Sequence, residues 1–372
     1  MQFGLTESQK ILKDNARKFF SVECPAAEVR RLMETDTAYD PALWSEMAEQ
    51  GFTGIIFPED AGGLGLGKVE LILLMEEMGY AMVPGPFFST VVLAGSVLDA
   101  CGNAEQKKKY LEPICQGKSR ATVAMVLDTA AKPDPEDGRV IVANGKLTGK
   151  KLFVTDAAVA DFIVVITSGG AFVTESKAPG VKISAMNTMD GTRKQCVVEF
   201  NNTSAEKLAG TTTGTMQAID LATAALVGEM VGGMQRALEI TVQYAKTRKQ
   251  FGKPIGSFQA VQHKCADMYL ETESSRSAAY YAAWALQEGA PDAAVAVSIA
   301  KMYASDACRN VGNNGIQVHG GMGFTWENDL HLYYRRAKAS ETMLGDAAFH
   351  RERIARLAID TQAAPAQTAK SA

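Results

Sequence analysis

The order of helical and strand patterns along the chain is the feature that most limits its fold. Residues 1–117 carry helical signals, residues 118–208 carry short β-branched runs divided by turn residues, and residues 209–360 return to long helical runs. A dinucleotide-binding sheet would instead alternate strands with helices. The sequence therefore predicts an α+β protein with a helical domain, a β domain and a helical bundle.

Local signals mark the two ends of this order. Thr6 precedes Gln9 by three residues, which is the spacing of a capping box at the start of a helix. Gly51 follows a helical run and is a candidate C-cap. Residues 361–372 are small and polar and contain proline, so we expect a disordered tail there.

Composition excludes several classes of function. The chain has 372 residues, 47% of them hydrophobic, which is enough for a sizeable core. A net charge of −4 leaves no basic footprint for nucleic acid. The N-terminal residues have no apolar signal segment, and no apolar run reaches the length of a membrane span. We expect a cytoplasmic protein without membrane insertion.

The cysteines and histidines show no metal-binding spacing. The six cysteines form no CxxC pair, and the four histidines form no HExxH motif. We expect the thiols to be reduced and buried, and we expect no metal site.

One glycine-rich segment nearly matches a phosphate-binding loop. In "GGLGLGKV", residues 62–69, Val69 stands where magnesium binding needs Ser or Thr. Pro58 and two acids also precede it where an entering strand is required. The sequence favours a turn leading into a helix over a nucleotide site.

Two later runs are ambiguous when each is taken alone. The first run is "YAKTRKQFGKPIGSFQAVQHKCADM", residues 244–268. Its Arg248 either complements a helix dipole or binds a pyrophosphate bidentately through its guanidinium. In "GIQVHGGMGFTWEN", residues 315–328, glycines either form a tight turn or let the backbone approach a ligand.

Together and in this order, the two runs resemble the FAD-dependent acyl-CoA dehydrogenase family. "FPEDAGGLGL" and "GKKLFVTDAAVADFIVV" resemble further motifs of that family, so the similarity extends over nearly the whole chain. The resemblance implies an N-terminal all-α domain, a middle β-barrel-like domain and a C-terminal four-helix bundle. It also implies FAD as cofactor, an acyl-CoA as substrate and an electron-transfer flavoprotein or similar acceptor as partner.

The resemblance assigns residues to FAD, which the family binds between subunits. Phe153 and Thr155 would lie against the isoalloxazine, Arg248 would reach the pyrophosphate in a neighbouring subunit, and residues 317–321 would form the facing strip from the other chain. The residues assigned to FAD are Phe153, Thr155, Arg248, Phe251, Phe258, Gln259, Gln317, Val318, His319, Gly320 and Gly321.

The family's catalytic base is missing. The reaction implied is removal of the α-proton of the thioester and transfer of a β-hydride to flavin N5, in acyl-CoA degradation. Leu344 matches the family's usual Glu, and Ala222 matches its alternative position. A second family loop, which contacts flavin and substrate, is replaced by "MVLDTAAKPDP", residues 125–135, and its first three residues, Met125, Val126 and Leu127, can offer only backbone hydrogen bonds.

A short branch of the family shares the ending Gly-Asp-Ala-x-x-His found here. That branch includes small subunits of heteromeric dehydrogenases that act on unusual acyl groups. The chain is therefore expected to form a homotetramer, or a heterotetramer with a related subunit.

Two hypotheses follow for the proton. In the first, the chain is an active dehydrogenase with a displaced base, and Asp346 is the leading candidate, although it also matches an N-cap position. Asp220 is the second candidate. Glu229 lies about 10 Å along the helix from Ala222, which is too distant for this role, and its alternative role is an ion pair within the bundle. In the second hypothesis, the chain is a non-catalytic partner subunit that completes the FAD site of another chain.

Overall fold

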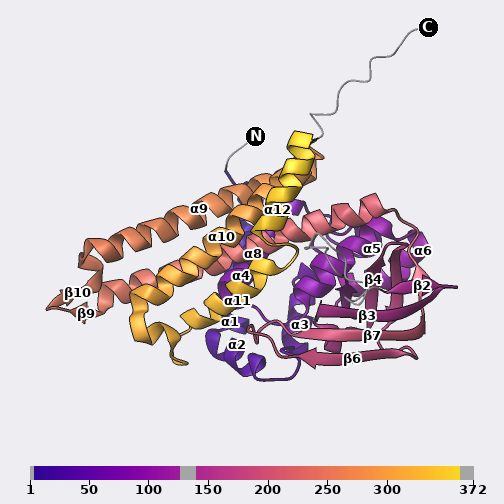
Figure 1. Cartoon of the computed structure of the whole chain (residues 1–372), viewed down its shortest axis with the longest axis horizontal. Coiled ribbons are helices and arrows are strands. Elements are labelled where there is room, and N and C mark those ends of the chain that lie inside the picture. The colour runs from indigo at the N-terminus through magenta and orange to yellow at the C-terminus, as the bar shows by residue number, and fades with distance from the viewer. Residues whose placement is uncertain (1–3, 126–139, 361–372) are drawn as a thin grey trace, which may run out of the picture.

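The computed structural model describes residues 4–125 and 140–360. Its elements follow the order expected from the sequence: helices, then strands, then long helices. Figure 1 shows the sheets at one end of the molecule, and the long C-terminal helices extend from them to the other end. The expected tail and the segment from Val126 to Leu127 lie outside the described residues.

The N-terminal part is helical. The expected capping box is confirmed, because Thr6 Oγ1 accepts from the Gln9 amide at 3.2 Å and Gln9 Oε1 accepts from the Thr6 amide at 3.0 Å. Its elements are α1 (Glu7–Glu23), α2 (Ala26–Met33), α3 (Pro41–Glu49), η1 (Phe52–Gly54), η2 (Glu59–Ala61), α4 (Lys68–Ala81), η3 (Phe88–Gly95), α5 (Ser96–Cys101), α6 (Ala104–Gln106), η4 (Lys107–Leu111) and α7 (Glu112–Cys115).

The glycine-rich segment before α4 is a turn into that helix, as the sequence favours. Lys68 is the first residue of α4 and its Nζ donates to the Leu286 carbonyl at 2.6 Å. Its ammonium is therefore used to join the N-terminal and C-terminal parts of the chain.

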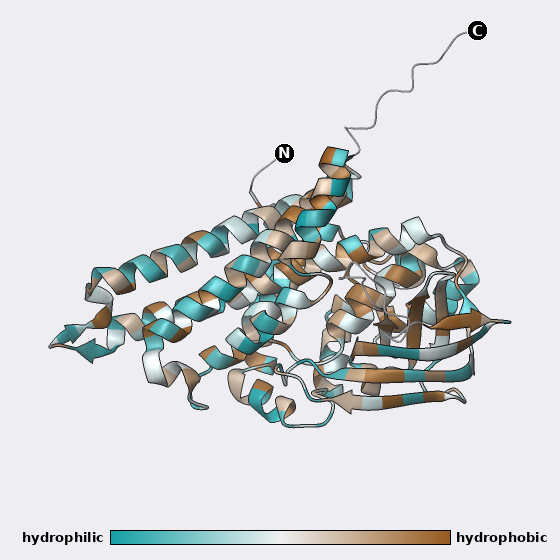
Figure 2. Ribbon diagram, in the orientation of Figure 1, coloured by the Kyte–Doolittle hydropathy of each residue, from teal (hydrophilic) through white to brown (hydrophobic). Residues whose placement is uncertain are grey.

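The middle part contains two four-stranded sheets, in the orders β1-β4-β5-β8 and β2-β3-β7-β6. Strand β1 pairs with β4 in parallel, and the other neighbours are antiparallel. Hydrophobic residues alternate with polar ones along several of these strands (Figure 2), as expected for sheets with one buried face. The elements are β1 (Ala121–Ala124), β2 (Ile141–Ala143), β3 (Lys146–Thr155), η5 (Ala157–Val159), β4 (Phe162–Thr167), β5 (Gly170–Glu175), β6 (Val181–Met186), β7 (Gln195–Ser204) and β8 (Glu206–Lys207).

The C-terminal part is a bundle in which α8, α9, α10 and α11 pack against one another. The 36-residue α8 runs along most of the molecule and also packs on α4 (Figure 1). The elements are α8 (Thr212–Thr247), β9 (Lys249–Gln250), β10 (Lys253–Pro254), η6 (Ile255–Ser257), α9 (Gln259–Glu288), α10 (Ala293–His319), η7 (Gly320–Phe324), α11 (Leu330–Thr342), α12 (Ala347–Ile354) and η8 (Ala355–Asp360).

The expectation that the cysteines are buried is confirmed for five of the six. All six cysteines are free thiols, and every one except Cys265 is buried. Within residues 4–125 and 140–360, no group of His, Cys, Asp and Glu side chains could hold a metal ion. None of the helices in the described part of the chain is long and apolar enough to cross a bilayer.

Candidate active site

The arm at the far end of α8 carries the first group of residues assigned to FAD. Arg248 caps α8 and is exposed, and a short hairpin of β9 and β10 follows it (Figure 1). Phe251 is 90% exposed, and its ring lies 6.1 Å from the Phe258 ring in an edge-to-face pair. Lys253 Nζ lies 4.5 Å from the centre of the Phe258 ring. The arm therefore presents aromatic faces and cationic groups to its surroundings.

The second group, residues 317–321, lies beside this arm in the same chain. The His319 ring stacks on the Tyr244 ring with centroids 4.3 Å apart. His319 Nδ1 donates to the Gly315 carbonyl at 2.8 Å, while its buried Nε2 has no partner. A Cβ added at Gly320 or Gly321 would meet no atom within 4 Å. Within one chain the two groups therefore lie next to each other, at the Tyr244–His319 contact.

The third group lies at the end of β3. The register of β3 against β7 shifts between Lys151 and Val154, and Phe153 there has φ +55°. The shift turns the Phe153 side chain outward to 64% exposure, while Thr155 is buried and its hydroxyl lies 3.2 Å from Gln195 Oε1. An exposed aromatic ring beside a hydroxyl suits the flat isoalloxazine.

The two positions that match the family's bases are apolar and buried. Leu344 is 7% exposed, and Ala222 is fully buried in α8. Asp346 is exposed, and its Oδ1 accepts from the Phe349 amide at 2.8 Å, so it caps α12. Asp220 forms an ion pair of 2.6 Å with Arg353.

A buried ion cluster of Asp190, Thr192, Arg193, Glu229 and Arg336 joins the middle part to the bundle. Arg193 donates to both oxygens of Glu229, at 2.6 and 2.7 Å, and Arg336 also donates to Glu229. Arg336 Nε donates to Asp190 Oδ2 at 2.6 Å and its Nη2 to Thr192 Oγ1 at 2.6 Å. Burial opposes ionisation of Glu229, but the two guanidinium groups outweigh it and lower its pKa. The cluster is thus a closed set of paired charges.

Asp156 lies beside the cluster and directly after Thr155. Its Oδ2 accepts from the Ser89 hydroxyl at 2.8 Å, and its buried Oδ1 has no partner. Burial raises the pKa of Asp156 to about 6, although Ser89 and the guanidinium groups of Arg193 and Arg336 favour the carboxylate.

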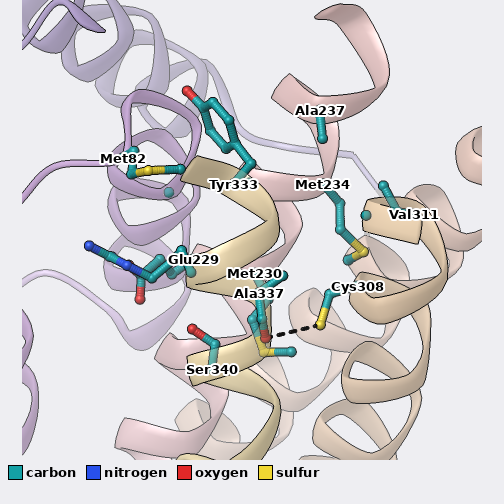
Figure 3. A pocket seen from close by; sticks show the side chains of 14 residues that line it. Met82, Glu229, Met230, Met234, Ala237, Cys308, Val311, Tyr333, Ala337 and Ser340 are labelled. Carbon is teal, nitrogen blue, oxygen red and sulfur yellow. Dashed lines mark hydrogen bonds and ion pairs between the residues drawn. The ribbon is translucent and has the colours of Figure 1, made fainter. Parts of the chain in front are cut away.

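Arg193 links the cluster to the loop that carries Leu344. Its Nη1 lies 3.8 Å from Met343 Sδ, and its guanidinium lies 4.8 Å from the centre of the Phe88 ring. A mostly apolar cavity inside the bundle lies next to Glu229 (Figure 3). The volume that the centre of a water molecule can occupy in it is only about 20 Å³. That space is close to the minimum that holds one water molecule. An acyl chain does not fit there without rearrangement.

Sequence reasoning missed the cluster, although one signal for it exists. Glu229 is a lone acid inside the apolar run "ATAALVGEMVGGM", and a carboxylate in such a run needs a buried partner. The identity of the partners could not be read from the sequence, because Arg193 and Arg336 lie 36 and 107 residues away along the chain.

Comparison with known proteins gives the family of a chain with this fold. Residues 6–118 match the model of the acyl-CoA dehydrogenase N-terminal domain, and residues 212–359 match that of the C-terminal domain. The acyl-CoA dehydrogenase IpdE2 of Mycolicibacterium smegmatis is 31% identical over 355 residues, which cover 95% of this chain and 98% of that protein. The chain belongs to the acyl-CoA dehydrogenase family.

Solved structures agree. One chain of the ChsE4–ChsE5 complex from Mycobacterium tuberculosis is 29% identical, with a TM-score of 0.88, covering 98% of this chain and 100% of that chain. PigA with FAD and proline is 26% identical, with a TM-score of 0.84, covering 96% and 98%. The expected fold class and FAD as the cofactor are thereby confirmed, as is an oxidoreductase class that acts on CH–CH bonds.

The residues present fit that cofactor. The orphaned Nε2 of His319, the open backbone at Gly320 and Gly321, and the exposed rings of Phe153 and Phe251 leave polar and aromatic groups that this chain does not satisfy by itself. A dinucleotide with two phosphates and two flat rings meets such groups.

Proposed function

We propose that the chain is one subunit of an acyl-CoA dehydrogenase whose catalytic carboxylate comes from a second, related chain. The observation that carries this proposal concerns the three acids that the sequence analysis considered as the base. Asp346 caps a helix, Asp220 pairs with Arg353, and Glu229 is held by two guanidinium groups. For Glu229 the two guanidinium groups outweigh burial and lower the pKa, which makes this carboxylate a weaker base.

The ion cluster also supports a catalytic carboxylate that comes from the second chain. An acyl chain needs a cleft with apolar walls, and the residues around Met343 instead enclose paired charges. Opening that space would require separating ions that are already out of water, which is costly. We infer that this chain does not hold the acyl group beside its own Leu344.

The arrangement of the FAD strips supports sharing of the cofactor between chains. Thr155 is followed by Asp156, which lies near Arg193, and Arg193 in turn binds Glu229 of α8. Arg248 lies 19 residues after Glu229 on the same helix. At 1.5 Å per residue the arm is about 28 Å farther along α8. In this proposal Arg248 binds the pyrophosphate of FAD held mainly by another chain. Thr155, whose hydroxyl donates to Gln195 Oε1 in the free chain, turns its hydroxyl to the flavin edge when FAD binds. FAD supplies the hydride acceptor.

The assembly in this proposal is a tetramer, formed by this chain alone or with a related subunit. The ChsE4–ChsE5 structure, which is a complex of two chains, supports the second form. Light scattering combined with the flavin absorbance tests it. We expect FAD only in dimers or larger species, and a monomer that retains one FAD per chain would contradict the proposal.

The substrate is an acyl-CoA, and the short branch that the sequence resembles points to an unusual acyl group. An electron-transfer flavoprotein or similar acceptor takes the electrons, and we place the reaction in cytoplasmic acyl-CoA degradation. Reduction of the acceptor by the assembled enzyme, with a panel of acyl-CoA thioesters, identifies the acyl group.

A second candidate function is a dehydrogenase that is active alone with Asp346 as the base. One observation favours it: Asp346 is exposed, lies two residues from Leu344, and its cap uses Oδ1. If this is right, Asp346→Asn should lower the rate of flavin reduction by acyl-CoA by about 10²-fold or more, since general-base catalysis contributes that much. Asn still caps the helix, so folding is preserved. Leu344→Glu, which restores a carboxylate at the family's position, is the matched gain-of-function variant. An unchanged rate in Asp346→Asn leaves Asp346 as a cap only.

A further inference from the structure

The loop of Met343, Leu344 and Gly345 between α11 and α12 has an unusual backbone. Leu344 has φ +58° and Gly345 has φ +96°. A leucine in the left-handed region is unfavourable and persists only where surrounding groups hold it. Leu344 nevertheless has its side chain buried. Something outside the loop must therefore fix its path.

Lys301 is the first group that does so. It lies in the middle of α10 with no exposed surface, yet it carries an ammonium. Its Nζ donates to the Glu341 carbonyl at 3.0 Å, the Gly345 carbonyl at 2.9 Å and Ser305 Oγ at 2.9 Å. An ammonium has three N–H donors, and all three are used. Two of these donors bind the Glu341 carbonyl before the loop and the Gly345 carbonyl at its end.

His350 of α12 is the second group. Its Nε2 lies 3.0 Å from the Leu344 carbonyl, which can only accept, so the imidazole carries its proton on Nε2. Burial and the charge of Lys301 lower the pKa of His350 to about 4, and the ring is therefore neutral near pH 7. The histidine of the Gly-Asp-Ala-x-x-His ending thus binds the backbone of the residue at the family's base position.

A simpler role for Lys301 is to satisfy the C-terminus of α11, where carbonyls lack helical partners. That role accounts for the bond to Glu341, which lies in the last turn. It does not account for the bonds to Gly345 and Leu344, which lie beyond the end of the helix at Thr342. Two buried donors from two different helices converge on these two adjacent carbonyls.

We propose that Lys301 and His350 are positioning residues that hold residue 344 buried and fix the loop at which this family places its base. The role assigned to the loop rests on family membership and on the proposed function, whereas the restraint itself is a property of the chain alone. In this chain the loop forms a fixed apolar wall, and Asp346 at its end is held as the N-cap of α12.

The restraint depends on the charge of Lys301. Burial lowers the pKa of Lys301 to about 8, although the nearby carboxylates of Asp346 and Glu341 favour the ammonium. The titratable groups around it are therefore Cys308 of α10, Glu341 of α11, Asp346 before α12, and His350 of α12. A neutral amine has two donors for the same three acceptors, so the loop is held less firmly above about pH 8.

Hydrogen exchange of the full chain with FAD tests the proposal without acyl-CoA or a second subunit. Its outcome is therefore independent of whether the chain is catalytically active. Lys301→Met and His350→Ala should each raise amide exchange from Met343 to Ala347 about tenfold or more, the loss of roughly one hydrogen bond or more. His350→Gln should stay close to the parent, because the Gln amide offers a donor where Nε2 stood. Lys338→Met, a partly exposed lysine of α11, is the control and should leave the loop unchanged.

Two results would overturn the proposal. One is a folded Lys301→Met protein with parental protection in the loop. The other is equal loop exchange in His350→Gln and His350→Ala, which would show that the donor is irrelevant. If Lys301→Met does not fold, the two His350 variants decide the question on their own.

Discussion

The arm at the end of α8 and the loop before α12 are both assigned by family membership to one reaction, yet they are built in opposite ways. In the arm, Phe251 is 90% exposed and Arg248 has its guanidinium at the surface. In the loop, Leu344 is 7% exposed, and two buried basic side chains bind the backbone. The first region is open to another molecule, and the second is closed by its own chain.

The difference separates groups that are available to another molecule from groups that are already paired within the chain. Exposed aromatic and cationic groups cost little in the free chain and gain their contacts on assembly. Buried paired charges such as Glu229, Arg193 and Arg336 gain their contacts during folding and are not available to a ligand. In the proposed assembly the chain therefore keeps the features expected to bind a shared cofactor, and it has filled the space beside its own base position.

The largest effect should come from breaking the ion cluster. Glu229→Ala leaves Arg193 without its carboxylate and Arg336 with Asp190 alone, so we expect the free energy of unfolding to fall by about 3–5 kcal/mol. Urea unfolding measures this. The control is Glu199→Ala, whose exposed ion pair with Lys182 is worth less than about 1 kcal/mol. Equal losses in the two variants would show that the cluster does not close the interior.

A smaller effect is expected in the arm, and on cofactor binding rather than on folding. Arg248→Ala should raise the dissociation constant of FAD by about 10- to 100-fold, because it removes charged hydrogen bonds to a phosphate. The free energy of unfolding should change by less than about 1 kcal/mol, since Arg248 is exposed. Fluorescence titration with FAD measures the first quantity. Lys246→Ala, two residues earlier at the same helix end, is the control, and equal weakening there would show that Arg248 acts only as a general surface charge.

The buried titratable groups should make the free energy of unfolding depend on pH. Between pH 6.5 and 4 the unfolded chain protonates His350 while the folded chain does not, because burial lowers its folded pKa to about 4. Folding therefore loses stability there as the pH falls. Asp156 acts in the opposite sense between pH 6 and 3.8, because burial raises its pKa to about 6 and the folded chain binds the proton.

Variants separate these two opposing contributions, each worth up to about 1.4 kcal/mol per pH unit. Relative to the parent, His350→Gln should gain unfolding free energy as the pH falls from 6 to 4, and Asp156→Asn should lose it. Thermal unfolding across this range gives both profiles. Parallel profiles in the two variants would mean that one of the groups is not buried as described.

The sequence predicted the fold well because its signals are local. The capping box at Thr6 and the β-branched runs of the middle part each act within a few residues. The FAD residues were inferred from contiguous motifs, and their binding of FAD remains a prediction. The structure does place His319 of residues 317–321 beside the arm, where its ring stacks on Tyr244. The contacts that close the interior were not predictable. Lys301 is 44 residues from Gly345, and the Gly-Asp-Ala-x-x-His motif includes His350 but does not show that its ring binds the Leu344 carbonyl.

Flavin reduction under anaerobic conditions tests the central claim most directly. The purified chain, reconstituted with FAD, is mixed with acyl-CoA thioesters, first alone and then with a related chain that carries Glu at the position of Leu344. The account predicts that the chain alone keeps its yellow colour and that the mixed assembly is bleached, with bleaching lost when that Glu is replaced by Gln. Rapid bleaching of the chain alone would contradict the account and would place the base within this subunit.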